Sequence, residues 1–389
     1  MTKEPRLTSD LQMSRRIRRT PFTSCIEKLG VSGFTVVNHT LLPKSFKNSV
    51  AEDFYHLRTA VQIWDVGCQR QVEIEGPDAL SLVQKMTPRN IANAEVGQCM
   101  YLALTNDKGK IINDPILLKL SDEKFWLSIA DSDVLLWAKA LAIGLDLNVS
   151  VSEPDVSPLA VQGPQAQEVM SEVFGKGVCD LNFFRFGLFD FKDTQQVISR
   201  TGYSSQDGYE IFLNDSKLGK EMWDVIWNVG AKYNMRPGGP NLIDRIEAGL
   251  ISYGNDMTSE NTPLECGMEK YCSLNKNMDF LGRDHLIAEK RIGPKRKIRG
   301  IVFSGKEQSA CTQPWQLHNE NINVGQITSG IFNPSLRVNT GIALIQKGSW
   351  NHGQSIKVVI GKDDIREGRV CFLPFTVQEN REIIQDLKI

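Results

Sequence analysis

Four polar stretches hold the side chains that could do chemistry in this sequence. Asp114 stands at the mouth of an apolar strand-like run within residues 101–120, and Glu210 ends a turn rich in glycine and serine. Arg245 lies in a helix-like run, and residues 324–330 form a fourth polar stretch beside a strand. Acidic residues that start strands are often only turn residues. Each stretch alone therefore gives weak support for a site.

Patterns that the chain lacks exclude several kinds of site. It has no GxxxxGK[ST] phosphate loop, no GxGxxG turn, no GxSxG elbow and no HExxH helix. The cysteines and histidines never fall at the spacing of metal ligands, so no metal site is predicted. The sequence therefore contains no local motif that indicates nucleotide-driven or metal-driven chemistry.

The composition limits the binding partners that are expected for this protein and indicates its cellular compartment. Lysine and arginine number 45 against 46 acidic residues, which leaves no basic footprint for nucleic acid. No apolar run approaches the roughly 18–20 residues of a membrane span. The cysteines are scattered without a CxxC pair, as is typical of reduced thiols, and residues 1–10 carry acids but no apolar core. We therefore expect a cytoplasmic protein that binds neither nucleic acid nor a membrane.

Two similar α/β units are predicted to position the polar side chains. Residues 70–75 alternate apolar and polar types as a half-buried strand does, and a helix follows Gly76-Pro77. A second helix follows Gly163-Pro164 in the same way. Further elements are expected as a hairpin in residues 101–120, strands at 125–129, 197–200 and 209–212, and helices at 134–145 and 242–250.

The last hundred residues differ from the rest. From residue 295 the pattern changes to short strands with turns, which indicates a separate all-β domain. A chain of 389 residues is also too long for one core, since single cores stop growing near roughly 250–300 residues. Gly293-Pro294 and the basic run after it mark the join.

Taken together and in this order, the polar stretches resemble the signatures of the folate-dependent aminomethyltransferase family, which includes the T-protein of the glycine cleavage system. The similarity covers nearly the whole chain. The matching motifs are TPL-type at residues 20–22, QGP at 162–164, R-x-GY(T/S)-x-(E/Q)DG-x-E at 200–210, R-x-EAG at 245–249 and (T/S)SG…PSL at 329–336. The resemblance implies an α+β fold of three domains, with two interwoven α/β subdomains in residues 1–290 and a barrel-like β domain in residues 291–389.

Within this family the chain is most similar to the dimethylsulfoniopropionate demethylases. The residues that carry this similarity are 14–23, 38–39, 64–74, 112–115 and 130–133. The glycine-cleavage pattern has Ser-His after its Asp-Val, where this chain has Gly67-Cys68. The resemblance implies a tetrahydrofolate-dependent methyltransferase that moves a methyl group from a small sulfonium or betaine donor to N5 of tetrahydrofolate. It leaves a homodimer open as the assembly.

The resemblance also gives roles to single residues. Glu210 matches the glutamate that binds the pterin ring, whose adjacent N–H donors suit a carboxylate. Arg245 matches an arginine near the folate, and Asp114 matches the aspartate near N5 and the one-carbon group. Tyr101 either lines the folate slot or fills a strand. Without the resemblance, Glu210 would be a surface residue at a strand end, and Arg245 would pair with an acidic neighbour on the surface of its own helix.

A cationic donor favours aromatic faces, and a donor carboxylate needs a positive partner. Tyr203 and Phe212 flank Glu210 in the sequence and are predicted to contact the onium centre. Arg16, in the basic cluster of residues 15–19, is the candidate for the carboxylate, with a solvated arm as the equal alternative.

Two other functions stay open. An aminomethyltransferase that acts on a lipoyl-bound intermediate would give 5,10-methylenetetrahydrofolate as its product. A folate-binding protein without transferase activity, as in the iron–sulfur maintenance branch of the family, would carry a Lys-Gly-Cys-type motif. The nearest residues here, 260–265, lack that motif.

Overall fold

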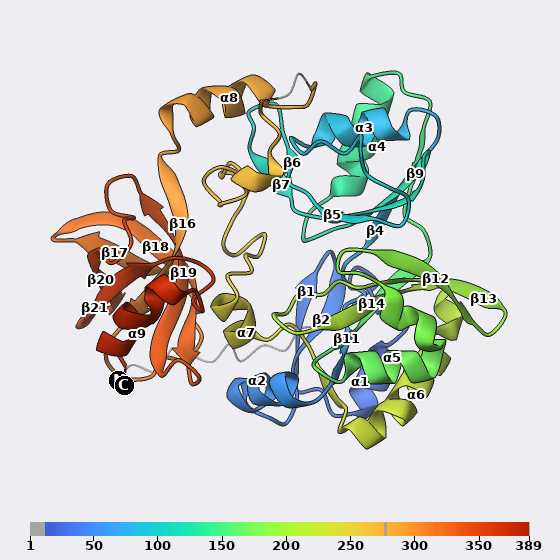
Figure 1. The fold of residues 1–389 in the computed structure, drawn as a ribbon, viewed down its shortest axis with the longest axis horizontal. Coiled ribbons are helices and arrows are strands. Elements are labelled where there is room, and N and C mark those ends of the chain that lie inside the picture. The colour runs from blue at the N-terminus through green and yellow to red at the C-terminus, as the bar shows by residue number, and fades with distance from the viewer. Residues whose placement is uncertain (1–11, 276–277, 389) are drawn as a thin grey trace.

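The computed structural model describes residues 12–275 and 278–388, which form three lobes around a central segment that contains α7 (Leu242–Glu247) (Figure 1). The first two lobes are sheets with helices, and the third is a closed β-barrel. The predicted α+β fold with a C-terminal barrel is therefore confirmed. The prediction about residues 1–10 lies outside the described residues.

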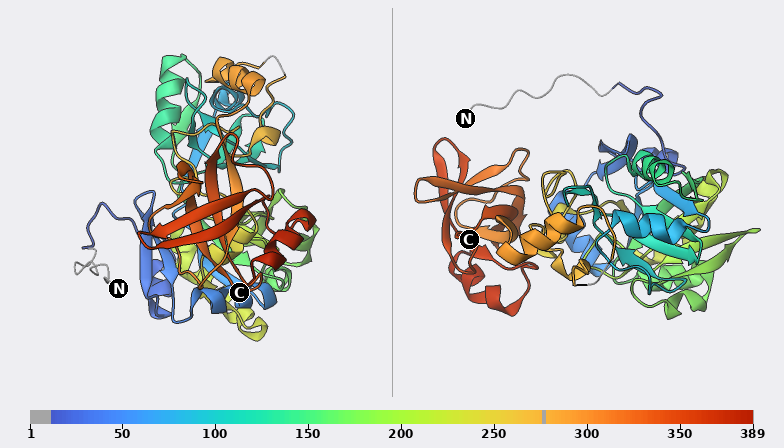
Figure 2. Two further views of the ribbon diagram at one scale, coloured as in Figure 1. Left: turned by 90° about the vertical axis from the view of Figure 1, so that its left-hand side faces the viewer. Right: turned by 90° about the horizontal axis from the view of Figure 1, so that it is seen from above.

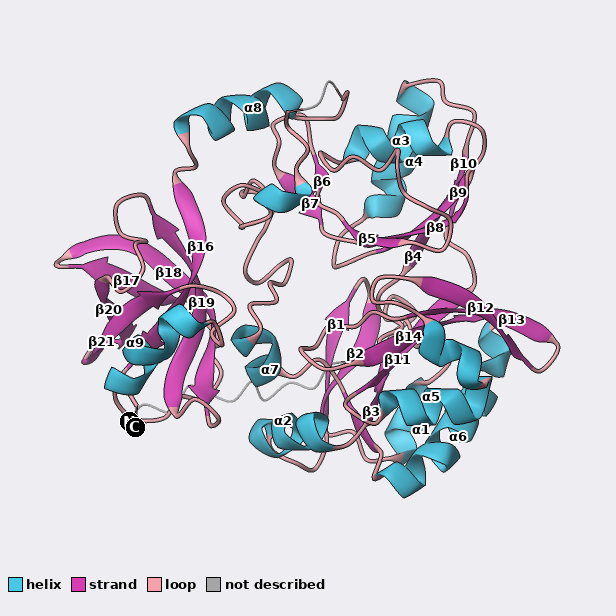
Figure 3. Cartoon of the chain, viewed as in Figure 1, coloured by secondary structure: helices cyan, strands magenta, loops and turns pink. Residues whose placement is uncertain are grey.

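The first lobe is a six-stranded sheet in the order β12-β13-β14-β11-β3-β15, in which only the β3–β15 pair is parallel. Helices α1, α5 and α6 lie on one side of it (Figure 3) and pack their apolar residues into one core cluster. The bounds are β3 (Gln62–Asp65), β11 (Val156–Gln162), β12 (Phe186–Phe191), β13 (Thr194–Ser199), β14 (Gly208–Asn214), β15 (Arg236–Gly238), α1 (Thr23–Lys28), α5 (Ala166–Phe174) and α6 (Gly219–Gly230). A hairpin of β1 (Gly33–Val37) and β2 (Thr40–Ser45) and helix α2 (Val50–Thr59) lie beside this sheet.

The second lobe is an antiparallel sheet in the order β10-β4-β9-β8-β5. Its core cluster is formed with two helices. The bounds are β4 (Gln71–Glu75), β5 (Cys99–Tyr101), β8 (Ile116–Ser121), β9 (Lys124–Ser128), β10 (Ser150–Ser152), α3 (Ala79–Met86) and α4 (Val134–Gly144). Between β5 and β8 the chain forms a separate small ladder of β6 (Leu104–Thr105) and β7 (Ile111–Asn113).

Two equivalent strand–turn–helix units occur where the sequence predicts them. The units are β4–α3 and β11–α5, and each turn contains a glycine with positive φ, +137° at Gly76 and +126° at Gly163. A side chain on Gly76 would come within 2.6 Å of the Asn148 carbonyl oxygen, and one on Gly163 would overlap the Ala60 carbonyl oxygen. Only glycine allows this close approach, which explains the recurring Gly-Pro pair.

The third lobe is a six-stranded barrel closed in the order β16-β19-β18-β17-β20-β21. Helix α8 (Arg283–Ile292) leads into it, and Figure 2 shows the barrel at one end of the molecule. The bounds are β16 (Arg296–Phe303), β17 (Trp315–Asn319), β18 (Ile322–Asn333), β19 (Val338–Gln346), β20 (Ser355–Gly361), β21 (Asp364–Cys371) and the C-terminal α9 (Arg381–Asp386).

Helix α7 is shorter than predicted. It ends at Glu247 rather than at residue 250, because Gly249 takes a left-handed conformation with φ of +70°. In the described ranges, no helix is long and apolar enough to cross a membrane.

Buried charged residues of α7 bind different parts of the molecule. Asp244 accepts hydrogen bonds from the backbone N and the Oγ of Ser205, at 2.8 and 2.5 Å, in the turn before β14. Glu247 pairs with Arg58 of α2 at 2.6 Å and accepts from Asn333 of the barrel at 2.7 Å. The short helix therefore joins the first lobe to the barrel.

Candidate functional site

Asp114 lies between β7 and β8, just before the second long strand of the predicted hairpin. The Tyr101 hydroxyl, on the neighbouring strand β5, donates a 2.8 Å hydrogen bond to Asp114 Oδ2. The other carboxylate oxygen, Oδ1, is buried and has no hydrogen-bond partner within the described residues. The Tyr101 ring also packs edge-to-face against the ring of Tyr271, with the ring centroids 5.3 Å apart. Asp114 is thus held in one orientation with one acceptor oxygen left open.

The surroundings of Asp114 change its acidity. Burial raises its pKa to about 7, the hydrogen bond from Tyr101 opposes this rise, and the charge of Asp256 adds to it. A carboxyl group with a pKa near 7 exists in both protonation states at neutral pH. It is therefore able to accept a proton or to attract a cation.

Glu210 is a buried residue of β14, with 6% of its surface exposed. It accepts a hydrogen bond from Thr201, whose hydroxyl lies 2.5 Å from that of Ser199. Burial raises the Glu210 pKa, and the bond from Thr201 opposes the rise. The alternative that Glu210 is a surface residue at a strand end is wrong.

The turn between Thr201 and Glu210 packs against the side chain of Gln162 and forms a hydrogen bond with it. A side chain on Gly202 or Gly208 would overlap the Gln162 amide, and the Ser204 hydroxyl donates to Gln162 Oε1 at 2.8 Å. The QGP motif thus supports the GY-x-x-x-DG motif directly. This packing sets the position of the intervening tyrosine, Tyr203.

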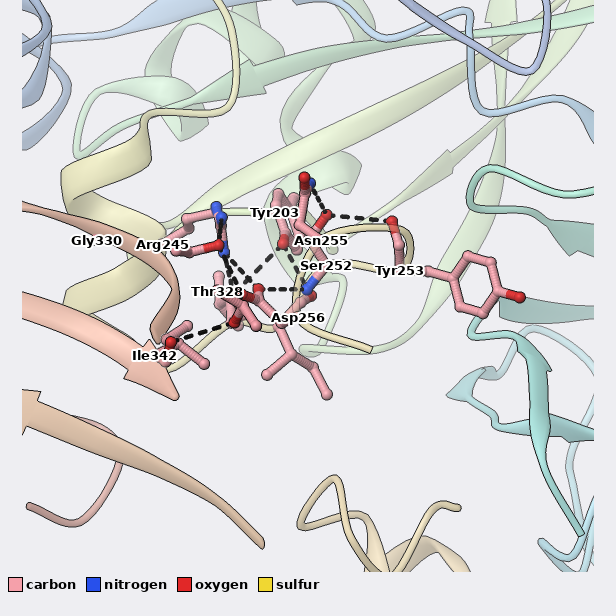
Figure 4. Close-up of polar contacts among 12 residues, drawn as sticks. Tyr203, Arg245, Ser252, Tyr253, Asn255, Asp256, Thr328, Gly330 and Ile342 are labelled. Atoms are coloured by element: carbon pink, nitrogen blue, oxygen red, sulfur yellow. Dashed lines mark hydrogen bonds and ion pairs between the residues drawn. The ribbon is translucent and has the colours of Figure 1, made fainter. Parts of the chain in front are cut away.

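Arg245 is buried, and both terminal nitrogens of its guanidinium donate hydrogen bonds to the protein (Figure 4). Nη1 pairs with Asp256 Oδ2 at 2.9 Å, and Nη2 donates to Ser329 Oγ of the barrel at 2.6 Å. Asp256 also accepts from Ser329 and Thr328, at 2.6 and 2.8 Å. The alternative of a surface ion pair within α7 is wrong, because the partner is Asp256 and the pair is buried. A direct contact of Arg245 with folate stays a prediction.

Tyr203 belongs to the same cluster as Asp114. Its hydroxyl donates to the Ile251 carbonyl oxygen at 2.8 Å, in the loop that follows α7. Burial raises its pKa, the nearby positive charge of Arg245 lowers it, and Asp256 and Asp114 raise it further. Four of the predicted site residues, Tyr101, Asp114, Tyr203 and Arg245, are therefore brought together.

The structure does not add Phe212 or Arg16 to this cluster. The Phe212 ring is 1% exposed and packs in an apolar cluster between the two sheets, with its centroid 6.2 Å from that of Trp126. The ring is therefore packed among apolar side chains, and its contact with the donor stays a prediction. Arg16 is exposed in the segment before α1, and its contact with a donor carboxylate stays a prediction.

Two residues of the cluster were not assigned from the sequence. Asp256 organises the contacts of Arg245, but its barrel partner Ser329 is 73 residues away in the chain. The ring of Tyr253 points away from that network toward strands of the second lobe (Figure 4), and the charge of Asp114 contributes to its raised pKa after burial. The sequence signal was only their nearness to the R-x-EAG motif. In the described ranges, no group of three or more His, Cys, Asp or Glu residues could hold a metal ion.

These features define a protein of the glycine cleavage T-protein family, and the chain belongs to it. The pattern of the GCVT N-terminal domain matches residues 22–276, and that of the glycine cleavage T-protein C-terminal barrel domain matches residues 296–376. The family prediction is confirmed.

Comparison with individual proteins shows which members of the family this chain resembles. The chain is 44% identical over 345 residues to dimethylsulfoniopropionate demethylase DmdA of Ruegeria pomeroyi, covering 89% of this chain and 94% of that protein. It is 30% identical over 330 residues to an aminomethyltransferase of Thermoanaerobacter, covering 82% and 87%. The crystal structure of glycine cleavage system aminomethyltransferase T from Bartonella henselae superimposes with a TM-score of 0.82 at 24% identity over 94% of this chain and 99% of that one, which supports the fold.

Tetrahydrofolate is the cofactor of this family, and the residues present fit it. Glu210 is a buried acceptor that carries one side-chain hydrogen bond, from Thr201, and so retains lone pairs for the N–H donors of a pterin. Asp114 Oδ1 is a second buried acceptor without a partner in the described part of the chain. Buried polar atoms of this kind are rarely left unpaired, so a ligand that supplies donors is expected.

Proposed function

We propose that this chain is a tetrahydrofolate-dependent demethylase whose methyl donor is a small sulfonium compound, dimethylsulfoniopropionate or a close analogue. The identity of 44% with a demethylase over nearly the full length supports the reaction class. The single structural observation that carries the proposal is the open Oδ1 of Asp114. This buried acceptor would face a cation or a departing proton.

Each residue then has a role in the transfer. Tetrahydrofolate, when bound, supplies N5 as the nucleophile. Glu210 holds the pterin, while Asp114 attracts the cationic donor and accepts the N5 proton at Oδ1. Tyr101 keeps the carboxylate in place, and the ring of Tyr203 offers an aromatic face to the onium centre. The leaving thioether is neutral, so alignment of the reactants matters more than a strong acid.

A product assay tests this proposal. The protein is incubated with tetrahydrofolate and either dimethylsulfoniopropionate, trimethylsulfonium or glycine betaine, and 5-methyltetrahydrofolate is measured by mass spectrometry. Formation of that product from a sulfonium supports the proposal. Its absence with every donor, in a preparation that binds tetrahydrofolate, contradicts it and favours a folate-binding role without turnover.

An aminomethyltransferase is the second candidate, because relatives of that name match at 30% identity. The same assay with an aminomethylated lipoyl carrier and ammonia detection separates the two. That activity would give 5,10-methylenetetrahydrofolate, which differs in mass from the methylated product. Gly67-Cys68 stands where the glycine-cleavage pattern has Ser-His, so we favour the demethylase.

We also infer a cytoplasmic location and leave a homodimer as a proposal. All eight cysteines are free thiols, as a reducing compartment requires. Leu136 and Ile143 of α4 are exposed apolar side chains, 62% and 82% accessible, that a second copy could cover. Light scattering after size-exclusion chromatography distinguishes a monomer of 43.7 kDa from its dimer.

A further inference from the structure

The side chain of Glu210 lies on the face of the first sheet that is turned away from its helices. Its neighbours in β14, Tyr209 and Ile211, pack in the core cluster that the helices cover. Side chains alternate between the two faces of a strand, so Glu210 points to the opposite face. Phe212 lies on that same face, and its ring contacts Trp126 of the second lobe. Glu210 therefore faces the lobe that carries the predicted catalytic carboxylate.

The protein provides one hydrogen-bond donor to the Glu210 carboxylate. Ser199 of β13 and Ala160 of β11 stand directly opposite Glu210 in the sheet, and residues paired in this way share a face. Ala160 has no polar side-chain atom, and the Ser199 hydroxyl bonds that of Thr201 at 2.5 Å. Thr201 in turn donates to Glu210 Oε2. Within residues 12–275 and 278–388, no donor to the other oxygen, Oε1, is recorded.

The two hydroxyl groups have a defined order of donation. A hydroxyl group carries a single proton, and an ionised carboxylate is able only to accept. The proton of Thr201 is therefore used for Glu210, and Thr201 must accept from Ser199. Ser199 and Thr201 are 0% and 4% exposed, so both hydroxyl groups are shielded from solvent. This series, from Ser199 through Thr201 to Glu210, holds the Thr201 hydroxyl in one direction.

The main chain of Thr201 is held as well. Gln162 Nε2 donates to the Thr201 carbonyl oxygen at 3.2 Å, and Gln162 Oε1 accepts from the Ser204 hydroxyl at 2.8 Å. One amide thus binds the chain on both sides of Tyr203. A threonine side chain also has few χ1 rotamers, because it is branched at Cβ. The position of the Thr201 hydroxyl is therefore determined by its own backbone and by Ser199.

We propose that Thr201 is a positioning residue for folate binding. Its hydroxyl holds Oε2 of Glu210 and so turns Oε1 toward the N–H donors of the pterin, while Ser199 holds the hydroxyl. The inference rests on the pterin contact of Glu210 in the proposed function. In this role Thr201 touches no ligand and acts only through Glu210. A carboxylate that is already fixed loses less conformational freedom when the ring binds.

Binding measurements on matched variants test this role. Thr201→Val keeps the shape and removes the hydroxyl, Thr201→Ser keeps the hydroxyl, and Ser199→Ala removes the supporting donor. Thr340→Val is the control, because Thr340 is a buried threonine of the barrel whose hydroxyl donates to the Ile331 carbonyl oxygen at 3.1 Å. The Kd of tetrahydrofolate is measured by isothermal titration, and Thr201→Val is also combined with Glu210→Ala. Thermal melting establishes that each variant is folded.

The proposal expects a loss of affinity that depends on Glu210. Thr201→Val should raise the Kd about three- to tenfold, Ser199→Ala should raise it less, and Thr201→Ser should stay within about twofold of the wild-type value. Thr340→Val should leave the Kd unchanged. In the Glu210→Ala background, Thr201→Val should weaken binding no further, whereas a merely structural role would weaken it equally in both backgrounds.

The outcomes separate this proposal from the one on which it rests. An unchanged Kd in Thr201→Val, or an equal loss with and without Glu210, overturns the role of Thr201 alone. An unchanged Kd in Glu210→Ala overturns the pterin contact and the role of Thr201 together. If Thr201→Val does not fold, Ser199→Ala in the two backgrounds applies the same test. Folate binding is measured without turnover, so the result holds whichever compound donates the methyl group.

Discussion

The hydroxyl of Tyr101 donates its hydrogen bond to only one of the two oxygens of Asp114, Oδ2, at 2.8 Å. Oδ2 is therefore bound to the protein, whereas Oδ1 is buried and has no hydrogen-bond partner among residues 12–275 and 278–388. The direction of the open lone pairs is therefore fixed before any ligand arrives. Such preorganisation costs no rearrangement at the moment of reaction.

Replacing Asp114 by asparagine tests the chemical role of this carboxylate. The amide keeps the shape and the partner of Asp114 but removes the negative charge and the basic oxygen. We expect tetrahydrofolate to bind with an unchanged Kd and the demethylation rate to fall by about a hundredfold or more. A normal rate in Asp114→Asn would remove the residue from the mechanism.

The raised pKa of Asp114 predicts how activity depends on pH. Because the ionised form is the active one, kcat/KM should rise with pH and level off above about 7. The hydrogen bond from Tyr101 lowers this pKa, so Tyr101→Phe should move the rise to higher pH. Profiles of kcat/KM between pH 5 and 9 for both proteins check the shift. A profile that does not change in Tyr101→Phe contradicts the assignment of the rise to Asp114.

Glu210→Ala should weaken the binding of tetrahydrofolate by about 1–3 kcal/mol, because the pterin donors lose their acceptor. Isothermal titration measures this change directly. Glu210→Gln is the matched control, since it preserves the volume and the contact with Thr201 while removing the charge. An unchanged Kd in Glu210→Ala would exclude the pterin contact.

Arg245→Ala should destabilise the protein. The change leaves Asp256 as a buried charge without its cation, which costs about 3–5 kcal/mol in the free energy of unfolding. Arg19→Ala, which breaks the exposed pair with Glu27, should cost less than about 1 kcal/mol. Urea denaturation of both variants provides the comparison. Full stability of Arg245→Ala together with lost folate affinity would instead place Arg245 against the ligand.

The local turns, and the places of Asp114 and Glu210 beside strands, were predictable from the sequence because short-range chemistry determines them, whereas the roles of both residues came from the family resemblance. Gly76 and Gly163 precede prolines and adopt positive φ. The Gly-Pro pair in the sequence is therefore enough to indicate a turn at each position. The hairpin around Asp114 needs only an apolar run on either side of a polar turn. These features depend on neighbours within about twenty residues.

Long-range contacts determine what the sequence did not predict. Phe212 lies two residues after Glu210, but its ring packs against residues of the second sheet, a contact that no short-range pattern predicts. Asp256 looked like one more acidic loop residue until the barrel placed Ser329 beside it. None of these relationships has a period or spacing that a sequence pattern could reveal.

Helix α7 determines when the site can exist during synthesis of the chain. Its residues Arg245 and Glu247 are bound by Ser329 and Asn333, which leave the ribosome more than eighty residues later. Until the barrel strand β18 has emerged, Arg245 has only Asp256 and Glu247 only Arg58 as a charged partner, and the loop with Asp256 lacks its contacts with the barrel. The nascent chain is therefore unable to bind folate through the completed site before nearly the whole protein has been made.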